Sequence, residues 1–167
     1  HPDSGGEPRQ WENSMDHVTM AQIKAFAVPP GRIGVWWLGQ LSYIFKSPAG
    51  KIVALDPYLT NSCYSAGAAL NSDRKFPPPI EPEDLVGIDL YVLTHSHQDH
   101  LDPETLARYR AAGGEGPYLA PPEAQEKLVA LGVAESAVTM TWPKKTHRLG
   151  DLVLTATFAV ATDAEDL

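Results

Sequence analysis

Three histidines and an aspartate fall within six residues, at His95, His97, Asp99 and His100. Histidine is the commonest metal ligand in proteins, and a carboxylate adds a hard oxygen donor. The cluster directly follows the apolar run 88–93, which predicts a buried strand. We therefore expect one or two divalent ions to bind where this strand ends, in a position where a protein can activate water.

The spacing of the four side chains predicts two pairs. Residues two apart point to the same face of an extended chain, so His95 and His97 are expected to bind one ion together. Asp102, followed by a proline, is predicted to be the N-cap of a helix. Asp99 and His100 then lie on the bend between strand and helix, and a second ion is expected there. The alternative is a surface loop that is rich in histidine.

Asp56 is a further candidate, because it ends the apolar run 52–55. An unpaired charge is costly at the end of a buried strand. Metal-bound histidines commonly donate their other ring N–H to a carboxylate, and we predict that role for Asp56. The alternative is a turn aspartate before Pro57. Asp99, beside the water that the ions would activate, is the expected catalytic residue for proton transfer.

The stretch His95-Ser96-His97-Gln98-Asp99-His100 resembles the His-x-His-x-Asp-His signature of the metallo-β-lactamase superfamily. The segments 37–40 (Trp-Leu-Gly-Gln) and 50–57 (ending Leu-Asp-Pro) are similar to those of its L-ascorbate 6-phosphate lactonase branch. The resemblance implies an α/β fold, the four-layer αβ/βα sandwich with metal ions between two sheets. It also implies a metal-dependent hydrolase that directs activated water at a lactone or other ester.

The family pattern requires more ligands after the motif than this sequence contains. Only His147 follows His100, and its place beside a predicted turn favours an exposed loop residue. The ending 161–167 resembles the point just ahead of the family's third histidine. The resemblance therefore implies that the chain supplies only the first half of the domain, with the remaining ligands beyond Leu167. The alternatives are a split enzyme and a half-site used differently.

Three functions stay open from the sequence. The preferred one is the lactonase-like hydrolase, with two Zn²⁺ by ligand type and Mn²⁺ as the alternative, because oxygen and nitrogen donors serve both ions. A phosphodiesterase of the same superfamily is the second, because a two-ion site also handles phosphoryl oxygens. The third is a non-catalytic half-domain that binds metal or a partner chain.

The composition limits the kinds of molecule that the protein is expected to bind. The formal charge of −8 over 167 residues argues against a nucleic-acid binder. The only adjacent basic pairs are Arg74-Lys75 and Lys144-Lys145, which read more readily as solvated loop charges than as contacts for a small anionic substrate. No apolar run is long enough to span a bilayer, so no membrane partner is expected. A single cysteine excludes an internal disulfide and fits the reducing cytoplasm.

The predicted elements alternate between strand and helix, which implies a layered α/β structure. Residues 1–32 are expected to form a tail and a helix over 15–27 capped by Ser14, and residues 33–167 the first part of a hydrolase domain. The predicted strands cover 33–45, 52–55, 88–93, 118–120, 138–142 and 146–160, and the predicted helices 103–111 and 122–131. A first half alone would expose an apolar face, so we expect association with the missing half or with another copy.

Overall fold

Six strands form one sheet in the order of the sequence. The computed structural model describes residues 18–65 and 74–158. The strands are β1 (Gly34–Trp37), β2 (Tyr43–Lys46), β3 (Ile52–Leu55), β4 (Leu90–Val92), β5 (Tyr118–Ala120) and β6 (Val138–Met140). β1, β2 and β3 pair antiparallel, whereas β3 to β6 pair parallel. The predicted α/β class is confirmed.

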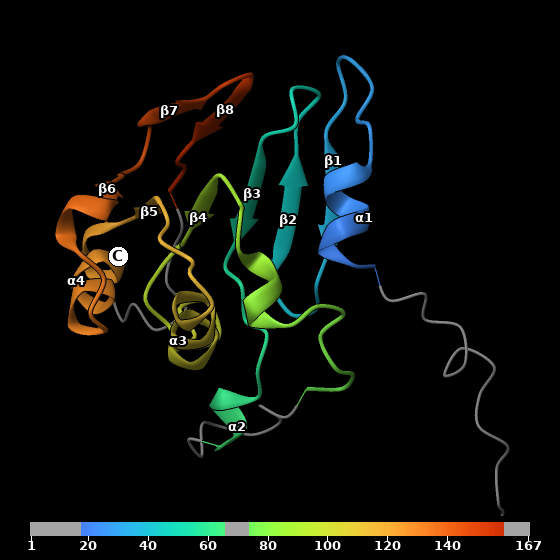
Figure 1. Ribbon diagram of the computed structural model, residues 1–167. Helices are drawn as coiled ribbons and strands as arrows, with labels where there is room; N and C mark the ends of the chain where they lie inside the picture. The colour runs from blue at the N-terminus through green and yellow to red at the C-terminus, as the bar shows by residue number, and fades with distance from the viewer. Residues whose placement is uncertain (1–17, 66–73, 159–167) are drawn as a thin grey trace, which may run out of the picture.

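Helices cover one face of this sheet (Figure 1). They are α1 (Met20–Ala25), α3 (Pro103–Ala111) and α4 (Pro122–Ala130), with the short segments α2 (Ser62–Ser65), η2 (Pro82–Leu85) and η3 (Glu135–Ala137) between them. Their apolar side chains join those of the strands in the main core, in which Ile23, Ile44, Leu106 and Leu128 are all buried. No helix among the described residues is long and apolar enough to cross a membrane.

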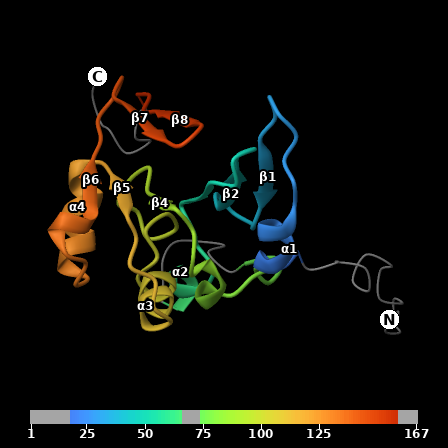
Figure 2. The same cartoon turned by 45° about the horizontal axis from the view of Figure 1, so that its top comes forward.

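A hairpin of β7 (Thr146–Leu149) and β8 (Leu152–Thr155) lies on the other face, with α1 and α3 on the far side of the sheet (Figure 2). Leu149 and Leu152 of this hairpin pack against a second apolar cluster on β3, β4 and β5. The hairpin does not cover the edge strand β1, where Val35 and Trp37 are 51% and 54% exposed. An apolar strip of the sheet therefore faces solvent.

Strand direction brings the chemistry to one edge. β1 runs antiparallel to β2, which runs antiparallel to β3, so β1 points the same way as β3, β4 and β5. The residues that follow these four strands, including Asp56 after β3 and the histidine motif after β4, therefore meet at a single edge. Parallel α/β sheets bind their ligands at this carboxyl edge.

The N-terminal helix is shorter than the predicted span 15–27. It begins at Met20, because Thr19 forms a capping box with Gln22: Oγ1 of Thr19 accepts from the Gln22 backbone N–H at 3.2 Å, and the Gln22 side chain accepts from the Thr19 N–H at 2.8 Å. The predicted cap Ser14 lies outside the described residues. A domain boundary at residue 32 stays a prediction.

Other local predictions agree closely with the structure. Helix α3 has the predicted bounds, and the carboxylate of its N-cap Asp102 accepts from the Glu104 N–H at 3.0 Å. Helix α4 ends one residue before the predicted limit. The predicted strands over 146–160 form a hairpin with its turn at Gly150 and Asp151, as predicted, and residues 159 and 160 lie outside the described part.

Candidate metal centre

The histidine motif occupies the loop between β4 and α3. β4 ends at Val92, and the loop closes in a turn in which the carbonyl of His97 accepts from the N–H groups of His100 and Leu101 at 3.0 and 2.7 Å. The motif is therefore not an extended strand. The hydrogen-bonded turn starts only at His97, and the pairing of His95 with His97 on one ion stays a prediction.

The structure brings the four predicted ligands together. The ring centroids of His95 and His100 lie 3.8 Å apart, and those of His95 and His97 lie 4.6 Å apart. Oδ2 of Asp99 is 3.7 Å from Nε2 of His100. His100 is buried, whereas the Asp99 side chain is half exposed. The cluster thus has a buried side chain, His100, and a solvent-accessible one, Asp99.

Asp56 anchors this cluster from the end of β3. Its side chain is 2% exposed. It accepts three hydrogen bonds: from the backbone N–H of Thr94 at 2.7 Å, from the Thr94 hydroxyl at 2.5 Å, and from Nδ1 of His100 at 2.8 Å. The backbone of Asp56 has a φ of +43°, a conformation that residues other than glycine seldom adopt. This carboxylate lies where the sequence analysis predicts an orienting partner for a histidine.

These bonds fix the tautomers of two rings. An ionised carboxylate only accepts hydrogen bonds, so Nδ1 of His100 carries the proton that it donates to Asp56. The Thr94 hydroxyl also donates to Asp56, and its oxygen then accepts from Nδ1 of His95 at 3.0 Å. In the neutral form of each ring Nε2 is then unprotonated, with a lone pair available for a ligand.

Electrostatics keep His95 in the same neutral form. Burial, and then the neighbouring rings of His100 and His97, lower the pKa of His95 below its ordinary value. Neutral imidazole is the form that binds metal ions. At neutral pH the His95 ring is therefore a donor of electrons to a metal and not a competing cation.

The donor set fits a divalent ion in its chemistry and in its orientation. Imidazole nitrogen with one carboxylate suits zinc and similar ions, and a carboxylate behind a ligating histidine is the usual support. Within residues 18–65 and 74–158, however, no three His, Cys, Asp or Glu side chains are arranged to hold an ion as they stand. The division of the ligands between two ions stays a prediction.

Two residues near the motif were not identified from the sequence. Thr94 connects Asp56 to His95, and its position directly before the motif is the only signal that could have singled it out. Lys127, on α4, donates from Nζ to the carbonyl oxygen of Ser96 at 2.6 Å and so holds the motif loop from 31 residues away. Nothing local in the sequence indicates that contact.

A second buried carboxylate braces the same edge. Asp102 is fully buried and accepts from the hydroxyls of Thr60 and Thr105 at 2.7 and 2.5 Å. The oxygen of Thr105 in turn accepts from the Leu59 N–H at 2.9 Å. The segment after β3 is thereby joined to the first turn of α3, and the motif loop lies between these two fixed ends.

The structure corrects two expectations. His147 is not an exposed loop residue: it lies in β7, is half-buried, and its Nε2 is 2.9 Å from Oγ1 of Thr141. Arg74 is not a solvated loop charge either, because its guanidinium is half-buried and donates to the backbone carbonyls of Leu38 and Tyr58. The strand around His147 was predicted, but the burial of His147 and of Arg74 depends on contacts outside their own elements.

A family model described as "Beta-lactamase superfamily domain" matches residues 53–166, which is more than half of the chain. The chain belongs to the beta-lactamase superfamily. The match begins in β3 and includes Asp56 and the whole histidine motif. The resemblance that the motif indicated is thereby confirmed.

Curated relatives agree with this membership. A "UPF0173 metal-dependent hydrolase" of Cupriavidus taiwanensis is 37% identical over 121 residues, which cover 68% of this chain and 35% of the relative. Another of that description, from Cupriavidus metallidurans, is 31% identical over 122 residues, covering 69% of this chain and 35% of the relative. The chain thus spans about a third of the length of these superfamily relatives.

A solved structure shares the fold. A mutant of the CmlA beta-hydroxylase superposes with a TM-score of 0.51 at 21% sequence identity, over 80% of this chain and 26% of the other. At that identity the likeness concerns the fold alone. It agrees with the mixed α/β sheet of this superfamily member.

Proposed function

We propose that the chain contributes the metal-binding half of a metal-dependent hydrolase. The observation that carries the proposal is the arrangement of Asp56, Thr94, His95 and His100. Asp56 holds His100 directly and His95 through Thr94, and in the neutral form of each ring this leaves Nε2 as the nitrogen with a free lone pair. Its relatives are named metal-dependent hydrolases, which supports the same activity here. The whole protein's activity is part of this proposal.

His95, His97, Asp99 and His100 would hold the ions, which we propose to be two Zn²⁺, with Mn²⁺ as the alternative. When bound, such ions lower the pKa of water towards neutrality and polarise the oxygen of a substrate carbonyl. Asp56 keeps His100 in position and in the required tautomer. Lys127 keeps the loop that carries the ligands against α4.

Asp99 is the proposed catalytic residue. Its carboxylate is half exposed and lies 3.7 Å from Nε2 of His100, so it reaches the open side of the cluster where a substrate would enter. A carboxylate in that place can accept a proton from attacking water and return it to the leaving group. The substrate that we propose is a lactone or other ester.

Metal content and turnover test the proposal together. The intact protein should bind zinc, measured by competition with a chromogenic chelator, and should hydrolyse a sugar lactone. Replacing both His95 and His97 by alanine should abolish zinc binding and turnover while circular dichroism stays unchanged. Zinc binding that survives this double replacement would show that the histidine cluster is not the metal site. A clear preference for bis(p-nitrophenyl) phosphate over the lactone would show that the enzyme is a phosphodiesterase and not an esterase.

The proposal extends to partners and compartment. The exposed apolar side chains of β1, Val35 and Trp37, support association with a further segment of the protein or with another copy. A single cysteine is compatible with the cytoplasm, where we place the protein.

A further inference from the structure

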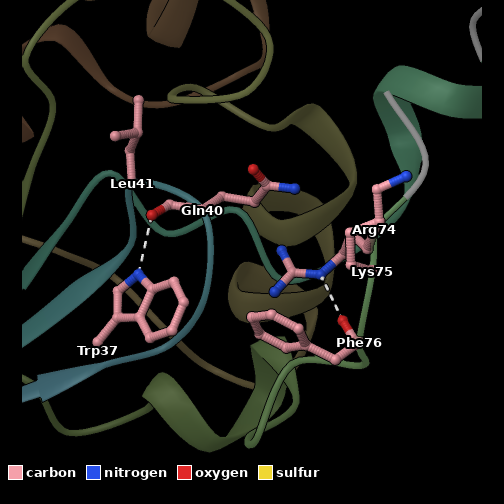
Figure 3. Close-up of a pocket in the computed structure, with 6 residues that line it drawn as sticks. All are labelled: Trp37, Gln40, Leu41, Arg74, Lys75 and Phe76. Atoms are coloured by element: carbon pink, nitrogen blue, oxygen red, sulfur yellow. Dashed lines mark hydrogen bonds between the residues drawn. The ribbon is translucent and has the colours of Figure 1, made fainter. Parts of the chain in front are cut away.

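A positively charged hollow lies at the same sheet edge as the histidine cluster. It has a volume of about 290 Å³ and is lined by Trp37, Gln40, Leu41, Arg74, Lys75 and Phe76 (Figure 3). Two of these six residues are cations and none is an acid, in a chain whose formal charge is −8. A hollow of one charge sign attracts ligands of the opposite sign.

Arg74 is held in place without being neutralised. Its guanidinium donates to three backbone carbonyls, those of Tyr58 at 2.6 Å, Leu38 at 3.0 Å and Phe76 at 3.4 Å. No carboxylate among the described residues forms an ion pair with it. A guanidinium has five N–H groups, so two remain for a ligand. The guanidinium is partly removed from water, and this burial lowers the pKa of Arg74.

The turn after β1 is shaped around this guanidinium. Gly39 has a φ of +94°, and a Cβ atom on it would overlap a terminal nitrogen of Arg74. Gln40 follows with a φ of +53°, and its carbonyl accepts from the indole N–H of Trp37 at 2.8 Å. Figure 3 shows the Gln40 side chain and the Arg74 guanidinium facing one another across the hollow.

The hollow and the histidine cluster are joined along the sheet edge. The Ser42 hydroxyl, in the turn beside the hollow, donates to the Asp56 carbonyl at 2.9 Å, and its oxygen accepts from the Tyr58 N–H at 2.8 Å. Asp56 in turn holds His100. Strands are spaced at about 4.8 Å, so β1 and β4 are roughly 14 Å apart. Arg74 contacts residues that follow both β1 and β3, which brings it nearer to β4, so a ligand that reaches from one site to the other spans on the order of 10 Å.

We infer that the hollow formed by Trp37, Gln40, Arg74 and Lys75 is a subsite for an oxyanion group on the substrate of the proposed hydrolase. The group is a carboxylate or a phosphate, since Arg74 offers two further N–H donors and both groups accept charge-assisted hydrogen bonds. Lys75, exposed at the rim, adds a second charge. The ester would lie at the histidine cluster and the oxyanion at Arg74. The inference rests on the proposed function in one respect, which is that the ligand is taken to be a substrate.

Anion binding is tested without turnover. In the intact protein, the indole N–H signal of Trp37, assigned with Trp37→Phe, is followed by NMR during titration with inorganic phosphate and, separately, acetate, with chloride at equal ionic strength as reference. We expect a saturable shift with one or both anions. Lys75→Gln should weaken binding about two- to fivefold, the effect of one lost exposed ion pair. Arg32→Gln makes the same charge change before β1, at the opposite sheet edge, and should leave binding unchanged.

A shift that never saturates, or that Arg32→Gln weakens as much as Lys75→Gln, would overturn the subsite. A kinetic arm then separates the two proposals. Esters with a neutral, a carboxylate or a phosphate end group about 10 Å from the reacting carbonyl are compared. Lys75→Gln should raise KM about two- to fivefold for the charged esters only, with kcat constant. Anion binding without hydrolysis of any ester would refute the proposed function alone, whereas hydrolysis of all three with equal KM would refute the subsite alone.

Discussion

Replacing Asp56 by asparagine separates orientation from packing at the histidine cluster. The amide has the same shape as the carboxylate but only one accepting oxygen. If that oxygen faces the Thr94 N–H, the amide NH₂ faces the Thr94 hydroxyl and Nδ1 of His100. In the wild-type protein both of these groups donate to Asp56. Both groups can turn into acceptors, but His100 then carries its proton on Nε2. The hydroxyl of Thr94 is also released to donate to His95.

The two consequences differ in size. Asp56→Asn should destabilise the protein by only about 1–3 kcal/mol, because the three hydrogen bonds re-form with neutral partners. Zinc affinity should fall by about 10–100-fold, because the unprotonated Nε2 is lost from both rings. At about 1.4 kcal/mol for each factor of ten, this equals roughly 1.4–2.8 kcal/mol of binding free energy. Urea unfolding measures the first quantity, and chelator competition measures the second.

Asp89→Asn provides a matched control. Asp89 precedes β4 at the opposite end of the strand, and it accepts from Nζ of Lys51 and from the Ile52 N–H, both at 2.8 Å. Its replacement also converts a hydrogen-bonded carboxylate into an amide, yet it should leave zinc affinity unchanged. Asp56→Asn with wild-type zinc affinity would refute the tautomer assignment. An equal loss in Asp89→Asn would show that the effect is not local to the cluster.

Three further predictions concern other parts of the chain. Lys46→Met should destabilise the protein by about 1–3 kcal/mol in urea, because the buried ammonium donates to three carbonyls at the end of α1; an unchanged unfolding midpoint would contradict this. The pKa of His147 is lowered from 6.5 by burial and then by Lys145, so its contribution to stability is present above pH 6.5 and is lost as the pH falls through the lowered value in the folded state. His147→Gln should therefore flatten the fall of the melting temperature from about pH 7 to about pH 5, and equal slopes would refute it. Val35→Lys should weaken concentration-dependent association in light scattering, and a wild-type protein that stays monomeric at every concentration would refute association through β1.

Tertiary structure decided every contact between distant segments. The Lys127 ammonium reaches Ser96 across 31 positions, and the Arg74 guanidinium reaches Leu38 across 36. Such hydrogen bonds leave no periodicity in the chain, because donor and acceptor belong to different elements. From the sequence alone we therefore expected Arg74 to be a solvated charge and assigned no role to Lys127. The strand that contains His147 was predicted, but the partial burial of its ring beside Thr141 was not.

The sequence by itself determined what depends on near neighbours and on residue type. Asp102 caps α3 because its carboxylate reaches the N–H two residues ahead, and the cluster from His95 to His100 needs only one turn to gather its rings. The sequence also indicated Asp56 as a site residue, since a charge that ends a buried strand requires a partner. Which partner, and hence which nitrogen of His100 stays free, was decided only when parallel pairing of β3 and β4 brought the two strand ends side by side.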